Sequence, residues 1–178
     1  ISAMLTLAQQ VHADADGPVE KLTDGDGPHL EAWREWPPEA EVVTEKGGFE
    51  SHGVLDALED LRGISVSLGS GASLFIEPTR ALVAVDVNTG PDTSPAAGLK
   101  ANMATARELP RQLRLRGLGG QITVDVAPMP KKDRRAFESA LRGAFRADSI
   151  ETTLVGWTPL GHFELQRKRA RLPVTEVL

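Results

Sequence analysis

Two apolar segments that each reach an aspartate near their end constrain the fold of this chain more than any other feature of its sequence. They are ALVAVDV at residues 81–87 and QITVDV at residues 121–126, and a segment with helical spacing lies between them. A strand–helix–strand unit places its two strands parallel in one sheet, with a right-handed crossover. We therefore expect an α/β (α+β) fold in which Asp86 and Asp125 lie at the carboxyl edge of the sheet, where such sheets bind ligands.

Two aspartates side by side repel each other, and a divalent cation between them removes the repulsion. A small number of hard oxygen ligands with room for water suits Mg²⁺, or Mn²⁺ in its place. Asn88 shares the strand face of Asp86, because side chains alternate along a strand. A metal held there can polarise a phosphoryl oxygen and activate water, so the pattern favours metal-assisted phosphodiester hydrolysis. The alternative is that each aspartate only caps the end of its strand.

Further helices and strands are predicted around this unit. Periodicity and turn residues delimit helices over 1–13, 53–62, 99–116 and 131–146, strands over 41–44, 64–68, 73–77 and 152–157, and a loop over 91–98. Residues 14–40 are acidic and rich in glycine and proline, which predicts a surface connection with one helical turn near residues 30–36. We expect an N-terminal helical and acidic portion over 1–62 and a second domain over 63–178.

The crossover helix contains one residue that disturbs it and a run that ends it. Pro110 removes a backbone hydrogen bond and predicts a kink or a late start of the helix. The sequence Leu118-Gly119-Gly120 then predicts its end.

Charge is distributed unevenly along the chain. The net charge is −5, but residues 14–60 carry 14 acidic and three basic residues, and residues 100–171 carry 15 basic and seven acidic residues. A basic segment joined to an acidic one indicates a polyanionic partner for the basic part. The alternative is two solvated faces of opposite sign.

Two groups of basic residues are candidates for contact with phosphate. Arg107, Arg111 and Arg114 are spaced to share one face of the crossover helix. A second group, Arg167, Lys168 and Arg169, belongs to the segment FELQRKRAR (163–171), which we expect to form a basic tail. Such side chains bind phosphate backbones without reading bases, although ordinary solubilising charge is the alternative.

Composition limits the classes of function. The chain has no cysteine, which excludes disulfides and thiolate zinc sites, and no apolar run approaches the roughly 20 residues that span a bilayer. We expect a cytoplasmic protein without membrane contact. Aromatic residues are 4% of the chain and tyrosine is absent, so a large base-stacking platform is not expected. Phe163 and Trp157 are candidates for stacking on one or two bases, and the alternative, which we favour, is that both are core residues.

Three segments together resemble the catalytic core of the ribonuclease E/G family. They are SGASLFIEPTRALVAVDVNTG (70–90), RQLRLRGLGGQITVDV (111–126) and PLGHFELQRKR (159–169), in the family's order. The resemblance implies a DNase I-like catalytic subdomain, preceded by a partial RNase H-like portion, and magnesium-dependent endonuclease activity on single-stranded RNA. It also implies that Asp86 and Asp125 bind the metal, that Asn88 supports the site, and that Asn102 matches an asparagine of the family's T-N-L-E stretch.

Several positions depart from the family's pattern. Pro128 in DVAPM replaces the second aspartate of a D-F-I-D-M segment, and Ala104 replaces the glutamate of T-N-L-E. Without cysteine the family's zinc-linked oligomer is not expected, and no S1 RNA-binding domain is recognised, which leaves a dimer or a separate partner domain open. An endoribonuclease core is the leading hypothesis. A non-catalytic RNA-binding or scaffold module is the second, and a small-molecule α/β enzyme is the third.

Overall fold

The computed structural model of this 178-residue chain describes residues 2–13, 17 and 41–177 and divides it into two compact units, Ile1–Gly48 and Phe49–Leu178. In the first unit, helix α1 (Ser2–Ala13) confirms the helix predicted there. The predicted strand at 41–44 is wrong: Val42 and Val43 are exposed, and the segment pairs with no strand in the described part of the chain. The connection and helical turn predicted within residues 14–40 lie outside the described residues.

A mixed sheet forms the centre of the second unit. Its strands are β1 (Ser65–Gly69), β2 (Ala72–Pro78), β3 (Val83–Asn88), β4 (Gly120–Asp125), β5 (Thr152–Trp157) and β6 (Phe163–Arg167). Among the described residues they form one six-stranded sheet in the order β1-β2-β3-β4-β6-β5. Only the β3–β4 pairing is parallel in this sheet, and the other neighbours run antiparallel. The predicted strand–helix–strand unit is therefore confirmed, and the chain has a mixed α/β fold.

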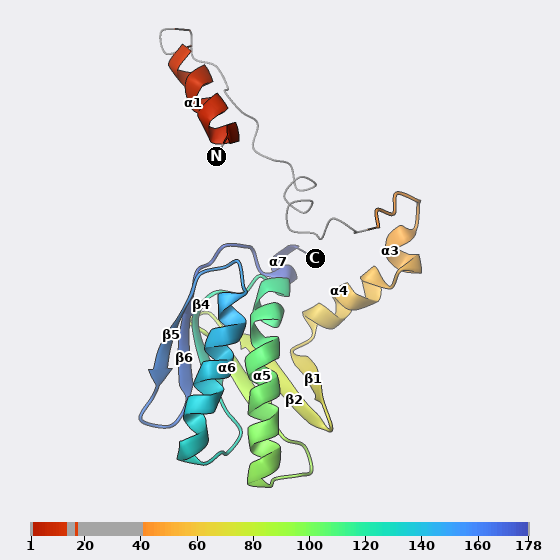
Figure 1. Ribbon diagram of the computed structural model, residues 1–178. Coiled ribbons are helices and arrows are strands. Elements are labelled where there is room, and N and C mark those ends of the chain that lie inside the picture. Colours follow the sequence, from red (N-terminus) through yellow and green to blue (C-terminus); the bar gives the residue numbers. More distant parts are fainter. Residues whose placement is uncertain (1, 14–16, 18–40, 178) are drawn as a thin grey trace. The chain divides into compact units, whose positions relative to one another are not determined.

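Two helices, α5 (Pro95–Leu115) and α6 (Arg134–Arg146), pack against each other and cover one face of the sheet (Figure 1). The burial pattern of β3 shows that the helices cover only one face, because its residues alternate between buried and exposed along its length. Val83, Val85 and Val87 face the helices, whereas Asp86 and Asn88 face the other way. A stripe of Phe137, Leu141 and Phe145 on α6 is buried in the same core, as are Leu74, Ile76, Leu109, Leu113, Ile122, Val124, Phe163 and Leu165. We call the face that these helices leave uncovered the open face.

Helix α5 is longer than the sequence predicted and begins earlier. Ser94 caps it by accepting a hydrogen bond from the backbone N–H of Ala97, and Pro95 occupies the first turn, where its missing N–H costs nothing. The expected loop at 91–98 therefore ends at Ser94. Pro110 lies inside the helix and is buried, so it does not delay the start.

The residue that terminates the helix is Gly117, directly after the C-cap Arg116, rather than one of the later glycines. Gly117 has a φ of 66°, its N–H donates to the carbonyl of Arg114, and the N–H of Leu118 reaches back to the carbonyl of Leu113. This pattern is a Schellman C-cap, in which glycine supplies the left-handed conformation. Gly119 serves a different purpose, since a Cβ there would lie 2.6 Å from the carbonyl oxygen of Lys168.

The segment predicted as a basic tail is a strand in its first half. Residues 163–167 form β6, which pairs with both β4 and β5. The sequence did not reveal this strand because its alternating residues include glutamate, glutamine and arginine. Phe163 and Leu165 nevertheless point into the core, and Phe163 packs edge-on against Trp157. Trp157 is partly buried, so both aromatic residues belong to the packed interior as predicted.

The described part of the chain also has four shorter elements, α3 (Gly48–Ser51), α4 (Val54–Arg62), η1 (Lys131–Asp133) and α7 (Val174–Val177). Arg116, at the C-cap of α5, ties two of them, α4 and α7, to that helix. The buried guanidinium of Arg116 donates to the carbonyls of Leu61, at 2.6 Å, and Gly63, and its own carbonyl accepts from the N–H of Val174. Burial lowers the pKa of Arg116 from its usual value, because the charged form loses hydration.

Two helical glycines give a matched test of close packing. A Cβ at Gly98 on α5 would collide with the carbonyl oxygen of Pro128, whereas a Cβ at Gly143 on α6 meets nothing within 4 Å. We predict that Gly98→Ala lowers the free energy of unfolding by about 1–3 kcal/mol, although alanine favours a helix. Gly143→Ala should raise it by up to about 1 kcal/mol. Urea denaturation measures both, and equal effects of the two substitutions would contradict the role given to Gly98.

Candidate metal and nucleic-acid site

Asp86 and Asp125 lie side by side on the open face. In the parallel pairing of β3 with β4, Asp86 is directly opposite Asp125, as predicted from the two segments. Neighbouring strands are about 4.8 Å apart, so the two carboxylates are close enough to share one small cation. Both residues are exposed, and 66% of the Asp125 side chain is accessible, which leaves room for water around such a cation.

Asn88 holds the first carboxylate in place. Its Nδ2 donates a hydrogen bond of 2.7 Å to Oδ2 of Asp86. The bond engages only one of the two carboxylate oxygens and fixes the orientation of the group. Outer partners of this kind orient metal ligands and raise the affinity of a site.

His162 stands beside the second carboxylate, and sequence reasoning missed it. Its Nε2 is 3.7 Å from Oδ1 of Asp125, and the side chain is 35% exposed. None of the four histidines of the chain has the spacing in sequence that is typical of metal ligands. The signal that could have found His162 is register: β6 is antiparallel to β4 with Phe163 opposite Val124, so the preceding residue lies opposite Asp125.

Asp86, Asp125 and His162 line a hollow of about 320 Å³. Phe75 on β2 borders it on the side of Asp86, since Phe75 and Asp86 are paired across β2 and β3. Thr123, Asp125 and His162 border the other side. The residues fit Mg²⁺ bound through two carboxylates with several waters kept, because that ion prefers oxygen ligands and dehydrates reluctantly.

The chain leaving β4 is clamped by Asn102. This side chain is completely buried on α5; its Nδ2 donates to the carbonyl of Ala127 at 2.8 Å, and its Oδ1 accepts from the N–H of Ala127 at 2.9 Å. Ala127 follows Asp125 by two residues. The helix therefore fixes the backbone next to the second carboxylate, which gives Asn102 a structural role in positioning the site.

The arginines of α5 are separated from the carboxylates by the sheet. Helix α5 packs on the face opposite to Asp86 and Asp125, so these arginines do not brace the acidic pair. Arg107 is exposed, and Arg111 pairs at 2.8 Å with Glu108 of the same helix. Arg114 pairs with Asp148 at 2.9 Å and is 34% exposed.

Arg167 is buried rather than exposed on a tail. Its side chain is 0% accessible, and its Nη2 lies 3.1 Å from the buried carboxylate of Asp148, which also receives Arg114. Its Nη1 donates to Oγ1 of Thr152 at 2.8 Å. This corrects the expected position of Arg167, and we leave it out of the RNA-contacting surface proposed below. Lys168 and Arg169 are exposed.

Asp148 and Glu108 allow buried and exposed ion pairs to be compared. We predict that Asp148→Asn lowers the free energy of unfolding by about 3–5 kcal/mol, because it leaves buried Arg167 without its counter-charge. Glu108→Gln removes the exposed pair with Arg111 and should cost less than about 1 kcal/mol. Chemical denaturation of both variants measures the difference. Similar costs would show that the Asp148 network contributes no more than a surface pair.

Comparison with known proteins identifies the family of the chain. The model of the ribonuclease E/G family matches residues 31–170. Ribonuclease G of Salmonella typhimurium (strain SL1344) is 33% identical over 193 residues, covering 98% of this chain and 39% of that protein. Ribonuclease G of Escherichia coli (strain K12) is 38% identical over 122 residues, covering 64% of this chain and 24% of that protein. Ribonuclease E of Nostoc sp. (strain PCC 7120 / SAG 25.82 / UTEX 2576) is 40% identical over 109 residues, covering 58% and 16%.

The chain belongs to the ribonuclease E/G family, and the resemblance found in its sequence is confirmed. It spans 39% or less of the length of these relatives. Within residues 2–13 and 41–177, no helix has both the length and the apolar character required to cross a membrane.

Proposed function

We propose that this chain is the core of a metal-dependent endoribonuclease that hydrolyses phosphodiester bonds in single-stranded RNA. One observation carries the proposal: in a member of the ribonuclease E/G family, two carboxylates lie in register on an uncovered sheet face, with Asn88 bonded to the first of them. The hydrolytic chemistry is the one that such a carboxylate pair serves with a divalent ion.

Each residue has a distinct task in this mechanism. Asp86 and Asp125 would hold Mg²⁺, or Mn²⁺ in its place, and the ion when bound would polarise the phosphoryl oxygen and activate water. Asn88 keeps the Asp86 carboxylate turned in one direction through its hydrogen bond. Asn102 keeps the backbone beyond Asp125 fixed against α5. The open face gives an extended RNA strand access to both carboxylates.

Other features of the proposal follow from the family rather than from the site. We propose a DNase I-like assignment for residues 63–178, a partial RNase H-like assignment for residues 1–62, and a cytoplasmic setting. Arg107, Arg111, Arg114, Lys168 and Arg169 remain proposed contacts to RNA phosphate. A dimer or a separate partner domain would complete the RNA-binding surface.

A second candidate is a non-catalytic RNA-binding or scaffold module. It is favoured by the small number of ligands: the described residues hold no group of three or more histidine, cysteine, aspartate or glutamate side chains suited to a metal ion. Pro128, in place of the family's second aspartate, points the same way. The two candidates differ in what a chelator does, since only the enzyme needs the metal.

The first functional prediction concerns cleavage. Asp86→Asn and Asp125→Asn should each abolish Mg²⁺-dependent cleavage of a labelled single-stranded RNA, because each removes a negative charge that holds the ion. Both variants should keep the fold, since both side chains are exposed. Asp56→Asn is a matched control on α4 and should cleave normally. Wild-type protein that binds RNA equally with and without chelator and never cleaves it would support the scaffold instead.

The second functional prediction concerns metal affinity. Asn88→Ala should weaken Mn²⁺ binding about 10- to 100-fold, because the Asp86 carboxylate loses its orienting hydrogen bond. Gln121→Ala removes another exposed amide from the open-face side of β4 and should leave the affinity unchanged. Electron paramagnetic resonance of free Mn²⁺ during titration measures both. Equal affinities of the Asn88→Ala variant and the wild type would remove Asn88 from the site.

A further inference from the structure

A second and larger hollow lies at the end of the sheet where β3 and β4 begin. Its volume is about 980 Å³, and it is formed by three stretches: the turn before β3, the glycine-rich entry into β4, and the chain after β6. These stretches meet because β3 and β4 are parallel and β6 is antiparallel to β4, so two strands start and one ends at this edge. The proposed metal site does not use this hollow.

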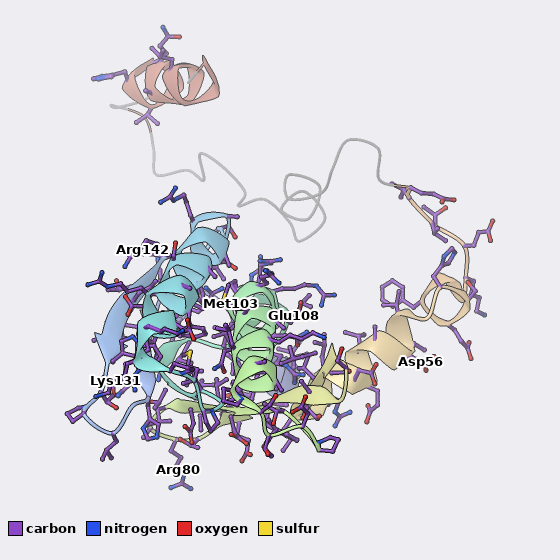
Figure 2. The ribbon with its side chains drawn as sticks, turned by 60° about the horizontal axis from the view of Figure 1, so that its bottom comes forward. Asp56, Arg80, Met103, Glu108, Lys131 and Arg142 are labelled. Atoms are coloured by element: carbon purple, nitrogen blue, oxygen red, sulfur yellow. The ribbon has the colours of Figure 1, made fainter. Side chains whose placement is uncertain are left out.

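The hollow is lined by three arginines, Arg80, Arg169 and Arg171, and by one acidic residue, Glu176. Arg80 and Arg169 have neither an ion pair nor a side-chain hydrogen bond within the part of the chain that the structure describes. Arg80 extends from the β2–β3 turn away from the body of the sheet (Figure 2). The hollow therefore carries a local positive charge in a chain whose net charge is −5.

The side chain of Arg169 lies against the glycines that open β4. Gly120 has a φ of 95°, and a Cβ there would lie 2.5 Å from Nη2 of Arg169, so the guanidinium rests against the glycine backbone. Gly119 admits the carbonyl of Lys168 in the same way. The glycine run thus leaves room for the Arg169 side chain beside the hollow, beyond its part in forming the strand. The β2–β3 turn is also fixed, because Oγ1 of Thr79 donates to the carbonyl of Leu82 at 2.7 Å.

The arginine hollow adjoins the carboxylate hollow. Leu82 lines both of them, and Val83 of the arginine hollow precedes Asp86 by three residues on β3. Three residues of a strand span about 10 Å. An anionic polymer could therefore occupy both hollows at once, with one phosphate near the carboxylates and another near the arginines.

The geometry points to a phosphate-binding subsite formed by Arg80 and Arg169, with Arg171 beside them, that holds the RNA backbone at a fixed distance from the bond to be cut. The inference rests on the proposed function for the identity of the polymer. The chemistry is that of guanidinium groups, whose planar donors match phosphate oxygens. A free nucleotide offers the same phosphate chemistry, and the experiment separates the two sources.

Binding of a fluorescein-labelled single-stranded RNA tests the subsite. Fluorescence anisotropy is measured in EDTA, so that cleavage does not interfere. The double variant Arg80→Ala/Arg169→Ala should bind on the order of tenfold more weakly than wild type, since a charge-assisted hydrogen bond contributes about that factor. The slope of log affinity against log salt should shrink by about 0.7 for each phosphate that the variant no longer neutralises.

A matched control removes the same charge elsewhere. Arg142→Ala/Arg146→Ala takes two exposed arginines from α6, which does not line the hollow, and should reduce affinity less (Figure 2). The single variant Arg80→Lys, with Arg169 unchanged, should retain part of the binding. Thermal unfolding of each variant checks that the fold survives.

The outcomes separate this inference from the proposed function. Equal weakening of RNA binding in the two double variants would show a net-charge effect and overturn the subsite. An Arg80→Ala/Arg169→Ala variant with the RNA affinity and salt slope of the wild type would also overturn it. If Arg80→Ala/Arg169→Ala loses binding of uridine monophosphate but binds RNA like the wild type, the hollow is assigned to free nucleotides and the RNA subsite is overturned. Weakened RNA binding in a protein that never cleaves RNA would support the subsite while the proposed catalysis fails.

Discussion

The parallel pairing of β3 with β4 is the constraint on which the rest of the second unit depends. It sets Asp86 opposite Asp125, and two like charges about one strand spacing apart are kept there by backbone hydrogen bonds rather than by attraction. A parallel pair needs a crossover, and α5 supplies it while covering the apolar face of the sheet. The same helix carries Asn102, which clamps the chain beyond Asp125, and Gly98, which lets that chain approach closely. One helix thus closes the topology, buries the core and positions the site.

The position of the pair on the open face explains how the fold tolerates it. Two like charges 4 Å apart repel by about 1 kcal/mol in water, but by several times more in a protein interior. Asp86 and Asp125 are both exposed, so water screens their repulsion until a cation arrives. The environment of Asp148 is different. That carboxylate is 1% exposed and is matched by Arg114 and Arg167, because a buried charge without a partner is costly. Exposure, and the lack of an arginine or lysine partner among the described residues, therefore distinguish the candidate site from the structural ion pair.

Local patterns in the sequence predicted the carboxylate pair. The positions that they did not predict depend on contacts between residues far apart in sequence. Alternation in ALVAVDV and QITVDV was sufficient to place Asp86, Asn88 and Asp125, since strand geometry and the crossover rule leave few choices. Arg167 could not be placed, because its burial depends on Asp148, which lies 19 residues away in sequence. His162 was missed for a similar reason, since it meets Asp125 only after β6 pairs with β4. The early start of α5 could have been predicted from Ser94 and Pro95, which are typical of a helix N-cap and first turn. Both residues were instead assigned to the expected loop.

Separation of opposite charges along β3 gives the two hollows compatible roles. Salt at physiological concentration screens charges beyond about 8 Å, and about 10 Å of strand lies between Val83 and Asp86. The arginines at one end therefore neutralise little of the negative charge at the other, and the carboxylates remain free to attract a cation. Arginines adjacent to Asp86 would instead form ion pairs with it and compete with the metal. A phosphate polymer that spans the hollows would be held at one end by guanidinium groups and presented at the other to the ion, so binding and hydrolysis would draw on different residues of one strand.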